Sequence, residues 1–248
     1  MNLFEVYPLY DVTPVRAEDV YVYDEKEVKY LDLYGGHAVI SIGHSHPHFV
    51  KKISNQLKQI AFYSNAIQNP LQKELANSIG EQSCLHDYRL FLCSTGAEAI
   101  ENALKLTSFH TGRKKVIAFK GAFHGRTSAA VAVTDNSAIN APLNSQHEVV
   151  FLPFNDKKAL ERELATETYC AVIFETIQGV GGLDEPTEDF VYAMESLCNT
   201  HGTCLIADEV QSGFGRSGTF FAYQKYQIAP HVITMAKGMG NGFPIGGI

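Results

Sequence analysis

Lys237 stands where an apolar run meets a glycine-rich stretch. Residues 231–236 read His-Val-Ile-Thr-Met-Ala and predict a buried strand, and glycines recur from Gly238 to Gly247. A buried ammonium is costly unless the amine is neutral or covalently bonded, so Lys237 is a candidate for an amine that forms a Schiff base. A lysine after a strand can also simply reach water, so its position needs support from other residues.

Asp208 ends a second apolar run, Cys-Leu-Ile-Ala-Asp at residues 204–208. A carboxylate buried at such a strand end can keep the nitrogen of a pyridine ring protonated. An aldehyde cofactor needs this when it draws electrons from a substrate. The alternative is a carboxylate that caps the turn after the strand.

Residues 94–98 read Ser-Thr-Gly-Ala-Glu and follow a strand predicted at 89–93. Thr95 and the glutamate three residues later have the spacing of a capping box at the start of a helix. The free N–H groups of Gly96 and Ala97, with the positive end of the helix dipole, suit a phosphate. The same loop serves equally well as an ordinary helix cap.

An aromatic residue and an arginine follow the strand predicted at 116–119, in Gly-Ala-Phe-His-Gly-Arg-Thr at residues 121–127. The flanking glycines suggest a tight turn, in which Phe123 lies against a flat ring and Arg126 faces an anion. Phe123 also fits as a filler of the core.

Five motifs in this order resemble the class III pyridoxal-phosphate-dependent aminotransferases. They are Ser94-Thr-Gly-Ala-Glu98, Phe123-His-Gly-Arg-Thr127, Glu175-Thr-Ile-Gln-Gly179, Asp208-Glu-Val-Gln211 and Ala236-Lys-Gly238 with Gly242-Phe-Pro-Ile-Gly246. The resemblance covers nearly the whole chain, and within the family it is strongest to the members that act on N2-acetylornithine. It implies a fold-type I architecture with pyridoxal 5'-phosphate as the cofactor.

The resemblance also implies roles for the residues around the cofactor ring. Lys237 would hold the cofactor and move the proton, and Asp208 would keep the ring nitrogen protonated. Phe123 would stack on one face of the ring and Val210 press on the other. Gln211 would hydrogen-bond to the phenolic oxygen of the ring.

Further roles concern the phosphate and the substrate. Gly96 and Ala97 would give N–H groups to the phosphate, helped by the hydroxyl of Thr95. Arg126 would bind a carboxylate of the substrate, because a planar guanidinium can hold such a group at two points. His37 lies in a segment that borders the substrate entrance in the resembled family.

Apolar runs that predict strands alternate with helical patterns from residue 89 onward. The strands are expected at 89–93, 116–119, 149–154, 171–176, 204–208 and 231–236. This alternation predicts an α/β fold with a mostly parallel sheet and helices on both faces. Since ligands bind beyond the carboxyl ends of such strands, we expect the five motif segments to converge on one rim.

The N-terminal part has a different pattern. Apolar runs at 20–23 and 28–33 predict an antiparallel hairpin. We expect residues 1–48 to form an N-terminal segment and part of a small α+β domain, and residues 49–248 to form a large domain that binds the cofactor. The apolar end of the chain also suggests that the C-terminal part of the large domain is absent.

Composition narrows the classes of partner. A net charge of −7 with scattered lysines argues against nucleic acid, and no apolar run is long enough for a membrane span. We therefore expect a cytoplasmic protein, whose five cysteines stay free in a reducing compartment. His44, His46 and His48 offer no tetrahedral set of ligands, so no metal is expected.

The expected reaction moves the terminal amine of N2-acetylornithine to 2-oxoglutarate, a step of arginine biosynthesis. Alternative donors are succinylornithine, ornithine and 4-aminobutyrate, and a truncated fragment that binds the cofactor without turnover is a further alternative. Val180 stands where family members often have a glutamate, and the lost charge favours a more anionic donor. The resemblance implies a homodimer, for which apolar surface at 62–67 and 126–133 is a physical hint.

Overall fold

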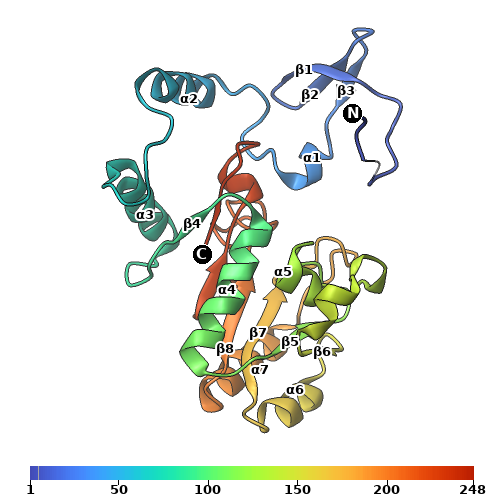
Figure 1. The fold of residues 1–248 in the computed structure, drawn as a ribbon, viewed down its shortest axis with the longest axis vertical. Coiled ribbons are helices and arrows are strands. Elements are labelled where there is room, and N and C mark those ends of the chain that lie inside the picture. Colours follow the sequence, from blue (N-terminus) through green and yellow to red (C-terminus); the bar gives the residue numbers. More distant parts are fainter. Residues whose placement is uncertain (5) are drawn as a thin grey trace. The chain divides into compact units, whose positions relative to one another are not determined.

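The computed structural model describes residues 1–4 and 6–248. The chain forms two compact units, Met1–Gln68 and Asn69–Ile248 (Figure 1). The domains predicted at 1–48 and 49–248 are those of the resembled family, and that division stays a prediction.

The first unit is built on an antiparallel sheet in the order β1-β2-β3. Its elements are β1 (Pro14–Glu18), β2 (Tyr21–Asp24), β3 (Lys29–Leu31), α1 (Gly35–Ala38) and α2 (Pro47–Gln59). Strands β2 and β3 confirm the predicted hairpin. Its turn is closed by Asp24, whose Oδ1 accepts the N–H groups of Lys26 at 2.8 Å and Val28 at 2.9 Å.

The second unit contains a five-stranded sheet in the order β6-β5-β7-β8-β9, and all four pairings are parallel. Its helices and strands are α3 (Pro70–Ser83), β4 (Leu92–Cys93), α4 (Gly96–Thr111), β5 (Lys115–Phe119), α5 (Ser128–Ala132), β6 (Val149–Leu152), α6 (Lys157–Leu164), β7 (Tyr169–Glu175), α7 (Glu188–Thr200), β8 (Cys204–Asp208), β9 (Val232–Thr234) and β10 (Gly246–Gly247). Short 3-10 helices lie at η1 (Ser137–Ile139), η2 (Pro142–Gln146), η3 (Ala222–Tyr226) and η4 (Lys237–Met239). The predicted α/β fold with a mostly parallel sheet is confirmed.

Strand β4 differs from the other predicted strands. It is limited to Leu92–Cys93 and pairs antiparallel with β10, outside the parallel sheet. The backbones approach closely there, because a Cβ atom on Gly246 would lie 2.7 Å from the carbonyl oxygen of Thr95. Gly247 in turn exchanges two backbone hydrogen bonds of 2.9 Å with Met235, so one antiparallel bridge links the β4–β10 pair to the residue that follows β9.

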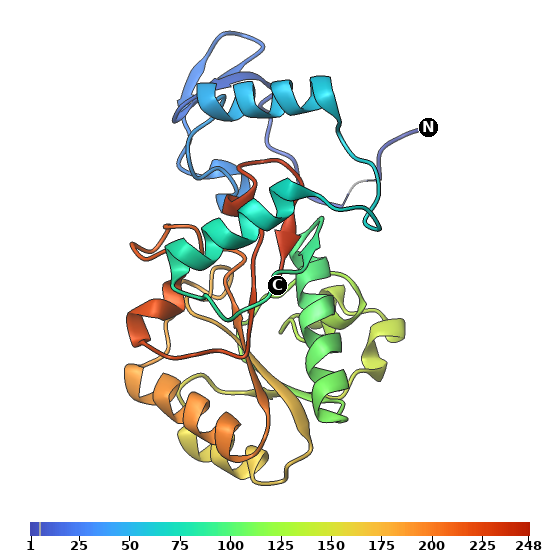
Figure 2. The ribbon, with the colours of Figure 1, turned by 90° about the vertical axis from the view of Figure 1, so that its left-hand side faces the viewer.

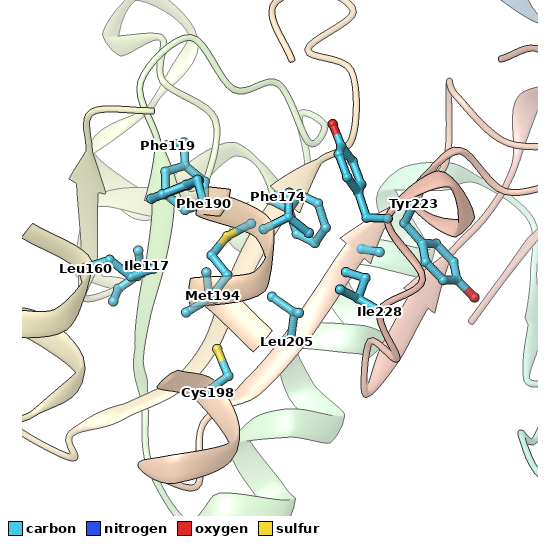
Figure 3. Packing of buried hydrophobic residues seen from close by; sticks show 14 of the residues in the cluster. Ile117, Phe119, Leu160, Phe174, Phe190, Met194, Cys198, Leu205, Tyr223 and Ile228 are labelled. Carbon is cyan, nitrogen blue, oxygen red and sulfur yellow. The ribbon is translucent and has the colours of Figure 1, made fainter. Parts of the chain in front are cut away.

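Two layers of helices cover the parallel sheet, because alternate residues of each strand face opposite sides. Helices α6 and α7 pack on one face and α4 and α5 on the other (Figures 1 and 2). On the α7 side, Phe174 and Leu205 pack with Phe190 and Met194 (Figure 3). All seven residues of β7 are buried, as expected for a central strand covered on both faces.

The apolar surface predicted around residues 126–133 is largely absent. Residues 128–132 form α5, and its Ala130 and Val131 are buried, because α5 packs against α4. The segment 62–67 does carry exposed apolar side chains, including Phe62 and Tyr63.

Three of the five cysteines, Cys170, Cys198 and Cys204, are buried as free thiols. Within residues 1–4 and 6–248, no helix is both long and apolar enough to cross a membrane.

The packing predicts a large cost for truncating Leu205, which is completely buried in β8. We expect Leu205→Ala to lower the free energy of unfolding by about 2–5 kcal/mol, because it leaves a cavity between the sheet and α7. The matched control Leu143→Ala removes a side chain that is 81% exposed, and it should change the free energy of unfolding by less than about 0.5 kcal/mol. Urea unfolding followed by circular dichroism measures both, and equal losses would contradict the assignment of the core.

Candidate functional site

The carboxyl ends of neighbouring strands lie in register at one rim of the sheet. Glu175 at the end of β7 pairs with Asp208 at the end of β8, and Asp208 pairs with Thr234 at the end of β9. The loops that follow β5, β7, β8 and β9 therefore start side by side. These loops carry most of the residues that the sequence singled out.

Asp208 is buried at the centre of this rim. Its Oδ1 accepts the N–H of Val210 at 3.0 Å and the hydroxyl of Thr234 at 3.1 Å, and its Oδ2 lies 2.7 Å from Nδ1 of His124. Because Asp208 accepts the N–H of Val210, it also caps the turn after the strand, which was the alternative role for this carboxylate. The pairing with His124 adds a buried ionisable partner.

Sequence reasoning gave His124 no role, although it lies beside Phe123 in the glycine-flanked turn. Burial by itself would lower the pKa of His124, but the hydrogen bond and charge of Asp208, with the charge of Glu175, raise it above its usual value. The ring therefore favours the protonated form and balances two buried carboxylates. Its Nε2 has no hydrogen-bond partner among the described residues.

The start of α4 has the predicted capping box. The hydroxyl oxygen of Thr95 accepts the N–H of Glu98 at 3.1 Å, and the Glu98 carboxylate accepts the N–H of Thr95 at 3.0 Å. The N–H groups of Gly96 and Ala97 begin the helix, so they have no carbonyl partner within it. Both can donate to an anion at the positive end of the 16-residue helix.

Lys237 is half-buried at the start of η4, and its backbone has a left-handed φ of 44°. Such a conformation is costly for a residue other than glycine and is often found at functional sites. Burial lowers the pKa of the Lys237 ammonium, and Arg216 lowers it further, although the charges of Asp208 and Glu175 oppose the shift. A larger share of neutral amine makes Lys237 a better nucleophile than a surface lysine.

Two of the residues predicted to contact the ring, Val210 and Gln211, pack closely against glycines of neighbouring loops. A Cβ atom on Gly96 would lie 2.8 Å from Cγ1 of Val210, so the loop at residues 94–97 and the loop after β8 are in contact. A Cβ atom on Gly179 would lie 1.6 Å from Oε1 of Gln211. Phe123, Val210 and Gln211 are each half-buried, which leaves part of each side chain accessible to a ligand.

Arg126 is exposed, and the segment after it is fixed by a residue that the sequence analysis did not single out. The carboxylate of Glu101 on α4 accepts the hydroxyl of Thr127 at 2.7 Å and the N–H of Ala129 at 2.7 Å. Glu101 therefore joins α4, which begins at Gly96, to the loop that carries Arg126. Its spacing from Thr127 gives no local signal, so only the tertiary structure reveals it.

A third residue that sequence reasoning missed, after His124 and Glu101, is Glu209, beside Asp208. It is completely buried and accepts hydrogen bonds from the hydroxyls of Thr176 and Ser212 at 2.9 Å each. It also accepts the N–H groups of Ala222 at 2.8 Å and Tyr223 at 2.9 Å. Burial raises the pKa of Glu209, and these four donors compensate for much of the cost of burying its charge.

All four of the singled-out histidines belong to the first unit, and His37 and His44 each have a local partner. His44 Nε2 lies 2.7 Å from Oδ2 of Asp32, and His37 Nδ1 bonds to the hydroxyl of Tyr34. Neither arrangement resembles a metal site. Among the described residues, no group of three or more histidine, cysteine or acidic side chains could hold a metal ion.

The family model for class-III aminotransferases matches residues 5–248. The chain belongs to the class-III aminotransferase family. The chain is 42% identical to the acetylornithine aminotransferase of Archaeoglobus fulgidus over 99% of its own length and 65% of that protein. The predicted resemblance is confirmed.

Solved structures of aminotransferases have the same fold. The ornithine aminotransferase of Toxoplasma gondii aligns with a TM-score of 0.91 at 25% identity, over 99% of this chain and 60% of that one. A taurine:2-oxoglutarate aminotransferase from Bifidobacterium kashiwanohense, in complex with PLP and glutamate, aligns with a TM-score of 0.90 at 24% identity, over 99% and 61%. This chain thus spans less than two thirds of the length of each of these relatives.

Class-III aminotransferases use pyridoxal 5'-phosphate, and the donor set at the rim fits this group. The first N–H groups of α4 suit its phosphate, the buried Asp208 suits a protonated ring nitrogen, and Lys237 supplies a reactive amine. Because Gly96 has no side chain, this turn can pack directly against Val210, where a Cβ atom would clash. The individual residue roles remain predictions.

The Asp208–His124 pair predicts a pH-dependent stability. Because the folded pKa of His124 is raised above 6.5, the pair stabilises the fold fully below about pH 6.5 and less as the pH rises through the raised value. In the apoprotein, the stability of His124→Gln relative to wild type should therefore improve as the pH rises. Urea unfolding between pH 6 and 9 tests this, with His86→Gln at an exposed position as the control. A constant difference across that range would contradict a raised pKa.

Proposed function

We propose that this protein transfers the terminal amine of N2-acetylornithine to 2-oxoglutarate with pyridoxal 5'-phosphate as its cofactor. The observation that carries the proposal is the half-buried amine of Lys237, which lies within the electrostatic influence of Asp208 and Glu175 at the rim. The identity of 42% with an acetylornithine aminotransferase supports this donor. The protein would then act in arginine biosynthesis.

Pyridoxal 5'-phosphate supplies an electron sink for the electrons left when a proton leaves the carbon that bears the substrate amine. Lys237 would hold the cofactor through Nζ, and the neutral amine would take up and release the proton that is moved. The low pKa of Lys237 favours both tasks, since each needs a neutral amine.

Asp208 holds a proton on the ring nitrogen, and His124 keeps the Asp208 carboxylate oriented through their 2.7 Å contact. Gly96, Ala97 and Thr95 bind the phosphate at the start of α4. Asp208 and the phosphate loop thus fix the group at two separated points.

The remaining contacts fix the ring plane and the substrate. Phe123 and Val210 would cover the two faces of the ring, and Gln211 would bond to its phenolic oxygen. Arg126 binds a carboxylate of the amine donor or of 2-oxoglutarate, for which its exposed guanidinium is suited.

Val180 favours one alternative donor. Its side chain is 66% exposed and uncharged, so it offers no repulsion to a second acidic group on the donor, beyond the carboxylate that all the candidate donors carry. Succinylornithine carries such a group, which makes its amine transfer the second candidate function. Ornithine and 4-aminobutyrate lack this support.

We propose in addition that the working protein is a cytoplasmic homodimer that binds neither nucleic acid nor membrane. Exposed Phe62, Tyr63 and Ile67 support a covered surface in an assembly. Part of a small domain at residues 1–48 and a large cofactor-binding domain at 49–248 complete the proposed organisation.

Turnover of a panel of amine donors tests the proposed function. With 2-oxoglutarate as acceptor and the complete gene product as enzyme, kcat/KM for N2-acetylornithine should exceed that for ornithine and 4-aminobutyrate by about 10-fold or more. A preference for either of the latter would overturn the proposal. A preference for succinylornithine would instead favour the second candidate, and Val180→Glu should then lower turnover of succinylornithine more than that of N2-acetylornithine.

Covalent labelling tests the role of Lys237. Borohydride reduction of the protein loaded with pyridoxal 5'-phosphate, followed by peptide mapping, should place the label on Lys237, because its amine has the lowered pKa. Lys237→Ala is the matched control and should lose the label. A label on Lys120 or Lys225 in the wild type would show that another amine binds the cofactor.

A further inference from the structure

Glu175, the last residue of β7, accepts hydrogen bonds from two different loops. Its Oε1 accepts the N–H of Phe123 at 2.9 Å, and its Oε2 accepts the N–H of Gly179 at 3.1 Å. The residue is only 7% exposed, so little water can replace these partners. One buried carboxylate thus joins the loop after β5 to the loop after β7.

These two loops also pack directly on each other. Gln178 donates from Nε2 to the carbonyl oxygen of Lys120 at 3.0 Å. A Cβ atom on Gly181 would lie 2.6 Å from the carbonyl oxygen of Gly121, so the backbones are in close contact. Glu175 supplies the charged hydrogen bonds of this junction, and such bonds are stronger than neutral ones.

The junction extends to a third loop through Gly179. The side chain of Gln211, from the loop after β8, lies so close to Gly179 that a Cβ atom there would be 1.6 Å from its Oε1. Glu175 holds the N–H of this same glycine. The carboxylate therefore acts on Phe123 directly and on Gln211 through the backbone of Gly179.

We propose that Glu175 is a positioning residue that sets the places of Phe123 and Gln211 in the site. The proposal rests on the proposed function, in which these two side chains contact the cofactor ring. A carboxylate is required because both of its oxygens accept hydrogen bonds. The amide of glutamine would turn an NH₂ group toward one of the two backbone N–H groups, which loses a bond and leaves a buried donor without a partner.

Cofactor binding to Glu175→Gln tests the proposal. The apoprotein is titrated with pyridoxal 5'-phosphate while absorbance and visible circular dichroism are recorded, since the dichroism of the bound ring reports how rigidly it is held. We expect binding to weaken about 10- to 100-fold and the dichroism per bound ring to fall. The matched control Glu185→Gln, at an exposed carboxylate that pairs with Lys225, should leave both unchanged.

A second variant covers the case in which Glu175→Gln does not fold, which unfolding of the apoprotein would reveal. Gly179→Ala keeps the carboxylate but pushes Gln211 aside, and Gly179 has no left-handed φ that an alanine would strain. Gly179→Ala should reduce the dichroism as Gln211→Ala does. The double variant should show no larger loss of dichroism than either single variant, because both substitutions act through the side chain of Gln211.

The outcomes separate this proposal from the proposed function. A folded Glu175→Gln protein with wild-type affinity and dichroism overturns the role of Glu175, and a Gly179→Ala protein that matches the wild type in both overturns its action on Gln211. The Gly179→Ala result bears only on the route through Gly179 to Gln211, since this variant keeps both hydrogen bonds of Glu175. Either result leaves the proposed function intact as long as reduction labels Lys237 in the wild type. A wild-type protein that binds no pyridoxal 5'-phosphate overturns both proposals.

Discussion

The register of the parallel strands is the constraint on which the rest of the second unit depends. Hydrogen bonding between β7, β8 and β9 aligns Glu175, Asp208 and Thr234 in one row. That row decides which loops meet, since each loop starts where its strand stops. The same pairing sends alternate side chains to two helix layers, so the core and the site are products of one set of backbone bonds.

Three buried carboxylates at this rim have different hydrogen-bond partners, and these partners give each carboxylate a different role. Asp208 has an ionisable partner in His124, Glu175 holds the backbone of two loops, and Glu209 receives four donors from the segments around it. Only Asp208 and Glu175 act on the charge of Lys237 strongly enough to oppose the lowering of its pKa by burial. The residue type alone therefore says little about function, and the set of hydrogen-bond partners says more.

Local patterns in the sequence predicted the parallel sheet, the capping box of Thr95 and the convergence of the motif loops. Each depends on residues that are close along the chain or on a general rule for parallel sheets. The partners His124, Glu101 and Glu209 could not be found in this way. Their bonds join segments far apart in sequence, as with His124 and Asp208, and no spacing rule connects such positions.

Strand β4 shows a related limit of sequence patterns. An apolar run predicts a strand but not its partner, and here the partner is a glycine pair more than 150 positions away, at Gly246 and Gly247. The prediction of an exposed apolar surface at 126–133 was wrong for a similar reason. Small apolar residues such as Ala130 are compatible with an exposed surface and with packing against a helix. The sequence alone does not show where that helix lies.

The complete burial of β7 limits how this part of the gene can change. Adding or deleting one residue within the strand would exchange its two faces, sending side chains fitted to α4 toward α7, and would move Glu175 out of line with Asp208. Insertions and deletions are therefore expected in the loops at the opposite end of the sheet, because one within a helix would also rotate its buried face away from the sheet. Lineages of this protein can vary in length there, while the strand itself can change only by exchanges between side chains of similar volume.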